Sequence, residues 1–331
     1  MRIGPNGQRR LRVLIGLGIG CALLAAVFST QDLDKVVAAT RLVGGGFALV
    51  ILWRFVSLGL VAQGWRHLFA PAERPAWWGA ALARWICEAA NNLLPVAQVG
   101  GEIARGRIIM RWPAPSGAAL PLLIAVATII VDMTLNLAGQ FALALAGAWH
   151  IWRTASLDLF QLILICLAVL LPLILLALAQ QPAVLARAHR NFSRLFGKGE
   201  ESAGTARLSD AVSAVYARRS GFCLALLLHI AAAASRALET WFVLTLMGTP
   251  VGVMDAVTIE GLSAALRTAA FLLPAGLGVQ EGALLVLCGW IGVAPSQALA
   301  LALIKRGREI AVGLSGLALW ALLERPRTRL I

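Results

Sequence analysis

The sequence predicts an all-α polytopic membrane protein, a class supported by its composition, its apolar runs and the positions of its basic residues. Of its 331 residues, 60% are hydrophobic and only 14% are charged, and the mean hydropathy is +0.81. Soluble domains usually carry about 25% charged residues, so the composition excludes an ordinary soluble domain. Apolar runs of about 20 residues, the length that crosses a bilayer as a helix, recur along the chain. We therefore interpret residues 1–331 as a single integral membrane domain.

The positive charge of the chain is explained by membrane topology. The formal net charge is +13, which taken alone would suggest a nucleic-acid partner. The Lys and Arg residues, however, lie mostly in short segments between apolar runs, as is typical of cytoplasmic loops next to anionic lipid. We therefore expect a bacterial inner-membrane protein with cytoplasmic N- and C-termini and no nucleic-acid partner.

No enzyme, metal or cofactor chemistry is indicated. The five cysteines stand singly in apolar segments, without CxxC spacing. The chain also lacks the GxSxG, HExxH, Walker A and GxGxxG motifs. We expect no cofactor, no metal site and no enzymatic activity.

About six apolar runs are long enough to be transmembrane helices. The first follows Arg9 and Arg10 and resembles a signal peptide. No small-residue cleavage site follows that run, so we interpret it as an uncleaved span. The expected spans are residues 11–29, 42–62, 118–147, 158–179, 220–247 and 298–323.

Two further apolar segments are interrupted in the same way. In each, a Leu-Leu-Pro sequence is followed seven positions after the proline by a glutamate, with small residues between them. The prolines are Pro95 and Pro274, and the glutamates are Glu102 and Glu281. Irregular backbone at membrane depth is tolerated only where protein encloses it or a cavity adjoins it. Matching interruptions in two halves of a membrane chain are the usual sequence indication of a transport site.

We interpret residues 76–112 and 254–294 as pseudo-repeated re-entrant broken hairpins. Two pairs of full spans, giving about eight spans in all, are the alternative. With a re-entrant first hairpin, the basic loop at residues 180–219 falls on the cytoplasmic side, as the positive-inside bias requires. The hairpins would then be inverted, and their turns would meet near the midplane of the bilayer.

Ten ionisable residues lie within apolar segments, where each costs about 2.5–3.5 kcal/mol on insertion scales. We expect them to face the protein interior or a hydrated cavity. Spacing along the helix predicts local ion pairs, which would be structural. The predicted pairs are Arg84 with Glu88, Arg236 with Glu239, and Glu260 with Arg267.

The remaining polar residues in apolar segments have individual interpretations. Asp132, in the middle of a span, is expected to pair with an arginine of an interrupted segment, such as Arg267. His229 stands alone and is expected to be a packing histidine. The side-chain amides of Asn91 and Asn92 are expected to satisfy backbone groups freed by Pro95.

Glu102 and Glu281 allow two interpretations. Each follows a break and would begin a helix, where free N–H groups and the helix dipole stabilise a carboxylate. They could therefore be structural N-terminal caps. Alternatively, they face a shared cavity and bind a lipid head group or a proton.

The two interrupted motifs resemble the flippase-like membrane region of lysylphosphatidylglycerol synthases. The resemblance covers nearly the whole chain, and the first motif is similar to a hopanoid-associated subgroup of that family. It implies an inner-membrane protein that moves lipid between leaflets or passes hopanoids on for export, with lipid-biosynthesis or export proteins as partners. The aminoacyl-transferase domain of the full synthases is absent from this sequence, so lysyl transfer is not implied. The motifs are Asn91-Asn92-Leu93-Leu94-Pro95-Val96-Ala97-Gln98-Val99-Gly100-Gly101-Glu102 and Phe271-Leu272-Leu273-Pro274-Ala275-Gly276-Leu277-Gly278-Val279-Gln280-Glu281.

The function expected from the sequence is therefore lipid translocation, with a hopanoid or phospholipid as substrate. The alternatives are a small-solute secondary transporter and a non-catalytic membrane scaffold for lipid-modifying enzymes. Residues expected to bind substrate are Glu88, Glu102, Arg105, Arg267 and Glu281. Residues expected to be structural or coupling are Arg84, Asn91, Asn92, Pro95, Asp132, Arg236, Glu239 and Pro274.

Overall fold

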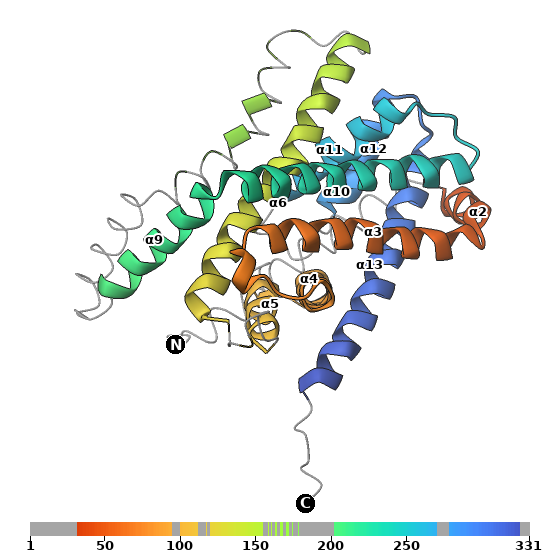
Figure 1. The fold of residues 1–331 in the computed structure, drawn as a ribbon. Coiled ribbons are helices and arrows are strands. Elements are labelled where there is room, and N and C mark those ends of the chain that lie inside the picture. The colour runs from red at the N-terminus through yellow and green to blue at the C-terminus, as the bar shows by residue number, and fades with distance from the viewer. Residues whose placement is uncertain are drawn as a thin grey trace, which may run out of the picture.

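The fold is helical throughout the part of the chain that the structure describes (Figure 1). The structure, a computed structural model, describes residues 32–94, 100–111, 117, 120–154, 202–269 and 278–324, together with scattered positions between 158 and 178. No strand occurs within these ranges. This confirms the prediction of an all-α polytopic membrane protein.

Three of the described helices are long and apolar enough to cross a membrane: α3 (Gly46–His67), α6 (Leu122–Thr154) and α10 (Arg219–Leu246). They coincide closely with three of the expected spans. The expected span 298–323 lies within α13 (Pro295–Glu324), which carries four charged residues near its middle. The expected span 11–29 lies outside the described residues, and only scattered positions of 158–179 fall within them.

Each interrupted segment contains two helices that pack against each other. Pro95 and Pro274 themselves lie outside the described residues. Whether the two segments re-enter the membrane or span it stays a prediction. The helices are α4 (Trp77–Leu93) and α5 (Gly100–Ile109) in the first segment, and α11 (Val253–Ala269) and α12 (Val279–Trp290) in the second.

Shorter elements complete the described chain. Helix α2 (Leu33–Val43) begins at Asp32, whose carboxylate accepts hydrogen bonds from the backbone N–H groups of Asp34 and Lys35. A single 3-10 turn, η1 (Pro71–Glu73), follows α3. Helix α9 (Ser202–Ala217) packs on α6 and occupies the second half of the expected basic loop. The most basic stretch of that loop lies outside the described residues.

Helix α6 approaches two neighbours closely because glycines remove side chains from the contacts. A Cβ atom on Gly261 of α11 would lie 2.7 Å from a backbone atom of Leu143. On α6, a Cβ on Gly147 would lie 2.7 Å from Thr258 of α11, and one on Gly139 would lie 2.8 Å from the backbone of His229 in α10. Small residues at helix contacts are the main means by which membrane helices pack tightly. Helix α6 is therefore held closely between α10 and α11.

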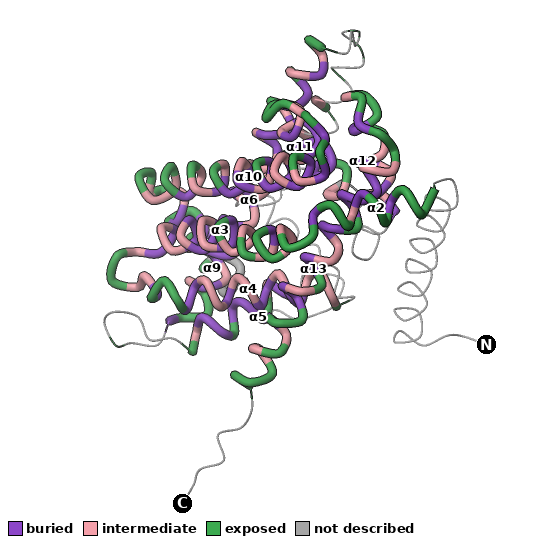
Figure 2. Tube along the Cα trace, turned by 90° about the vertical axis from the view of Figure 1, so that its right-hand side faces the viewer, coloured by how far each residue is buried: buried purple, intermediate pink, exposed green. Residues whose placement is uncertain are grey.

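The outer faces of the helices are apolar, whereas many charged residues lie inside. In Figure 2 exposed residues follow the outward sides of α3 and α10. A surface of this kind suits lipid, and it leaves the interior to hold the polar groups. Exposed apolar side chains on the long helices include Leu49, Leu52, Val56, Leu227, Leu238, Ile310 and Leu314.

We predict that Gly261→Ala lowers thermal stability in detergent, because the new methyl group meets the backbone of α6. Overpacking of this kind typically costs about 1–3 kcal/mol. The matched control is Gly282→Ala in α12, where no atom lies within 4 Å of the added Cβ. The melting temperatures of the two purified variants are compared with the parent. An unchanged melting temperature for Gly261→Ala would contradict the close contact between α6 and α11.

Candidate functional site

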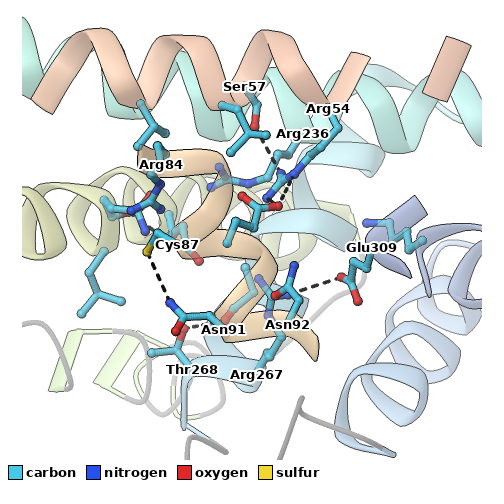
Figure 3. Close-up of a pocket in the computed structure, with 18 of the residues that line it drawn as sticks. Arg54, Ser57, Arg84, Cys87, Asn91, Asn92, Arg236, Arg267, Thr268 and Glu309 are labelled. Carbon is cyan, nitrogen blue, oxygen red and sulfur yellow. Dashed lines mark hydrogen bonds and ion pairs between the residues drawn. The ribbon is translucent and has the colours of Figure 1, made fainter. Parts of the chain in front are cut away.

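A cavity of about 250 Å³ lies between helices of both interrupted segments and the long helices α3, α6, α10 and α13. Figure 3 shows labelled side chains from α3, α4, α10, α11 and α13 around it. Its wall is unusually charged for a membrane interior, with six basic and four acidic side chains. The basic residues are Arg54, Arg84, Arg236, Arg267, Lys305 and Arg308, and the acidic residues are Glu88, Glu102, Glu260 and Glu309.

Asp132 is the centre of a buried network behind one side of the cavity. Its Oδ2 accepts a hydrogen bond from Nη1 of Arg105 at 2.5 Å, and its Oδ1 lies 2.9 Å from Nε2 of His229. All three side chains are fully buried. Arg105 also pairs with Glu102 on the cavity wall at 2.8 Å and stacks over the Trp65 ring at 4.5 Å. The network joins α5, α6 and α10, and it links them to the wall.

A second ion pair crosses from α3 to α4. Nε and Nη2 of Arg54 donate to the same oxygen of Glu88 at 2.7 and 2.5 Å, and Nη1 donates to Ser57 Oγ at 3.2 Å. Both charged side chains are largely buried. Charge-assisted hydrogen bonds of this length are among the strong ones, so they fix Glu88 on the wall.

The charged stripe of α13 reaches three neighbouring helices. Lys305 pairs with Glu260 of α11, and Arg308 pairs with Glu239 of α10. Arg306 donates to Glu281 of α12 at 2.9 Å and to Glu309 of α13 at 3.0 Å. These contacts explain how four charges can stand in five residues of an otherwise apolar helix, since each has a partner of opposite sign.

The three ion pairs predicted between residues of one helix (Arg84 with Glu88, Arg236 with Glu239, and Glu260 with Arg267) are wrong, whereas Glu102 does pair with Arg105, three residues later on α5. In those three cases the partners among the described residues lie on other helices, since a neighbour at helical spacing is only one of several neighbours in a packed bundle. Asp132 does pair with an arginine of an interrupted segment, but that arginine is Arg105 rather than Arg267. Arg84 pairs with Glu102 and Asp132, Glu88 with Arg54, Arg236 and Lys305 with Glu260, Arg308 with Glu239, and Arg267 with Glu309.

Glu102 and Glu281 are each the third residue of a helix, yet they lie in different surroundings. Glu102 is on the cavity wall. Glu281 is 2% exposed and does not belong to the wall. Its Oε2 accepts a hydrogen bond from the backbone N–H of Gly278 at 2.8 Å, closing a capping arrangement at the start of α12, and its Oε1 faces Arg306. The geometry of Glu281 is therefore that of a helix cap.

Asn91 joins the two helices of the first interrupted segment. Its Oδ1 accepts a hydrogen bond from the backbone N–H of Gly101 at 3.0 Å, and its Nδ2 lies 3.6 Å from Sγ of Cys87. A Cβ at Gly101 would lie 2.3 Å from the carbonyl oxygen of Cys87, so only glycine fits there. Asn92 lies on the cavity wall. The asparagines thus stand where α4 and α5 meet the cavity.

Sequence reasoning missed Arg54 and the charged stripe of α13 as parts of the site. Arg54 is a lone arginine within an apolar run. Because charged residues are rare and costly inside membrane spans, its presence there indicates that it faces the protein interior. The stripe of Lys305, Arg306, Arg308 and Glu309 lies within an expected span and gives the same indication. Within the described ranges, no cluster of three or more His, Cys, Asp and Glu residues could hold a metal ion.

Comparison with known families identifies this architecture. Residues 13–316 match the family model described as the lysylphosphatidylglycerol synthase TM region. The chain belongs to this family. Membership supports a membrane-embedded multi-pass protein with a lipid-related function, and the match covers a transmembrane region without a catalytic domain. No curated protein matches the chain.

We predict that Asp132→Asn destabilises this family member by about 3 kcal/mol, because it leaves Arg105 buried with one partner fewer. The measurement is the melting temperature in detergent. The control is Glu324→Gln, which removes a weak and exposed contact with Arg111 at 3.9 Å and should change little. Equal stability of the two variants would show that the Asp132 network does not hold α5, α6 and α10 together.

Proposed function

We propose that the protein is a lipid translocator of the bacterial inner membrane, with cytoplasmic termini. The observation that carries the proposal is a charged cavity inside a bundle whose outer faces are apolar. Family membership supports it, since the family is named for lipid synthases. In this function the head group of a polar lipid occupies the cavity, while its apolar part stays in the bilayer.

Physical chemistry explains why such a cavity assists translocation. A polar or charged head group loses its hydration when it enters hydrocarbon, at a cost of several kcal/mol (about 2–7 for a single neutral polar group). Charged and polar side chains along the wall replace part of that hydration. A volume of about 250 Å³ is below the range of about 300–1,000 Å³ typical of drug-sized ligands. It therefore suits a head group and not a whole lipid.

The expected binding residues take different roles in this proposal. Glu88, Glu102 and Arg267 lie on the wall and contact the head group directly. Arg105 and Glu281 act from behind the wall, by holding Glu102 and the start of α12 respectively. Alternating exposure of the cavity to the two leaflets would come from movement of the interrupted segments relative to the long helices, as in other transporters with broken helices.

We predict that Ala264→Trp blocks translocation, because Ala264 lies on the cavity wall and a large ring there fills the space for the head group. The control is Leu266→Trp on the same helix, where the side chain is 45% exposed. Purified variants are reconstituted into liposomes that contain a fluorescent phospholipid, and translocation is followed by its accessibility to a membrane-impermeant quencher. Unimpaired activity of a well-folded Ala264→Trp protein would exclude this cavity from the path.

The hopanoid association implied by the first motif gives a separate prediction. We expect loss of the gene in its native host to leave total hopanoid unchanged and to raise its share in the inner membrane. The measurement is the hopanoid content of separated inner and outer membranes, with a complemented strain as control. An unchanged distribution would dissociate the protein from hopanoids and leave phospholipid translocation or small-solute transport as its function.

A further inference from the structure

The cations on the cavity wall are not equally paired. Each acidic side chain of the wall already has a close basic partner within hydrogen-bonding distance. Glu88 is held by Arg54, Glu102 by Arg105, Glu260 by Lys305 and Glu309 by Arg306. The negative charge of the wall is therefore largely neutralised by these four contacts.

Three arginines of the wall are left without a close partner among the described residues. The closest contacts of Arg84, Arg236 and Arg267 with acidic oxygens are 3.8, 3.9 and 3.7 Å long. No side-chain hydrogen bond joins any of the three to another residue of the described ranges. A guanidinium group carries five N–H donors in a planar fork, so most donors of these three groups have no protein acceptor among the described residues.

The three arginines come from different helices and face the same cavity. Arg84 lies on α4, Arg236 on α10 and Arg267 on α11, and Figure 3 shows them among the lining residues. Counted together with the ion-pair partners behind the wall, the described charged network around the cavity holds eight basic and seven acidic side chains, a surplus of one positive charge. A surplus of this kind inside a membrane bundle calls for a counter-anion or water, because unpaired charge is costly there. Water alone would hydrate the cations without neutralising them.

We propose that Arg84, Arg236 and Arg267 form a binding subsite for the phosphate of an anionic lipid head group. Planar guanidinium forks match the oxygens of phosphate and bind them with two hydrogen bonds at once. This proposal rests on the proposed translocation function, because it names the class of lipid that the protein would move. Binding can nevertheless be measured without transport, so the two proposals fail separately.

The first experiment measures binding of lipids with identical acyl chains to the purified protein in a neutral detergent. The probes are phosphatidylglycerol, phosphatidylcholine and diacylglycerol, with glycerol 1-phosphate as the water-soluble phosphate. We expect phosphatidylglycerol to bind at least tenfold more tightly than diacylglycerol, and phosphatidylcholine to lie between them. Equal affinity for phosphatidylglycerol and diacylglycerol would overturn the subsite. Glycerol 1-phosphate is the test for a soluble ligand. If it binds as tightly as phosphatidylglycerol, and substitution of the arginines weakens its binding, the site is one for soluble phosphates. That result would overturn the proposal that the site binds a lipid.

Variants then assign the preference to the three arginines. Arg267→Gln is the primary variant, because its side chain is 35% exposed and its one ion pair among the described residues is long, so folding should survive. We expect it to weaken phosphatidylglycerol binding about tenfold, equivalent to about 1.4 kcal/mol.

A pair of variants at Arg236 separates charge from guanidinium geometry. Arg236→Lys keeps the positive charge but loses the planar guanidinium group, so it should retain part of the affinity that Arg236→Gln loses. The control is Arg41→Gln, an exposed arginine of α2. Full affinity in an Arg236→Gln, Arg267→Gln double variant would overturn the proposal.

Liposome assays separate this inference from the function on which it rests. Arginine-dependent lipid binding without translocation would retain the subsite and reject the translocator. Translocation of phosphatidylglycerol and diacylglycerol analogues at equal rates, unchanged by Arg267→Gln, would retain the translocator and reject the subsite.

Discussion

The ion pair between Asp132 and Arg105 is the interaction on which the rest of the structure depends. Both side chains are fully buried, and a charge in such surroundings persists only when its partner is in place. His229 occupies the other oxygen of Asp132, and Glu102 occupies the other side of Arg105. One carboxylate therefore connects α10, α6 and α5 and positions a glutamate of the cavity wall. The same constraint applies to α13, whose charged residues reach α10, α11 and α12 because none of them can remain unpaired in an apolar bundle.

Apolar runs predicted the long helices well, since a span of about 20 apolar residues has few alternatives in a membrane chain. The insertion cost of charge also indicated that Glu88, Asp132 and Arg236 face the interior, and the structure places all three there. The choice of partner was not predictable in the same way. Spacing along one helix shows which residues share a face, whereas an ion pair in a bundle depends on which helices adjoin that face. Arg54 illustrates the difference: nothing in the sequence near it indicates Glu88, which lies 34 residues away.

The two interrupted segments have similar sequences but make different contributions to the cavity. Glu102 and Glu281 occupy the same position in their helices, yet Glu281 is used as a cap and a partner of Arg306. The second segment instead presents Glu260 and Arg267, both on α11, to the cavity. In both copies of the motif a helix begins two residues before the glutamate, because a helix start is a local property. Repetition of the motif does not reproduce a binding site, which depends on the surface that the segment meets.

In the proposed translocator, the distribution of charge around the cavity would give a physical basis for binding and release. The interrupted segments contribute Arg84, Glu88, Glu102, Glu260 and Arg267, which together contain more acid than base. The surplus of positive charge comes from the long helices α3, α10 and α13. If the interrupted segments move relative to these helices, the balance of charge that faces a bound head group changes with them. Closer approach of the acidic side chains would weaken the hold of the arginines on an anion, so the movement that exposes the cavity to the opposite leaflet would also favour release there.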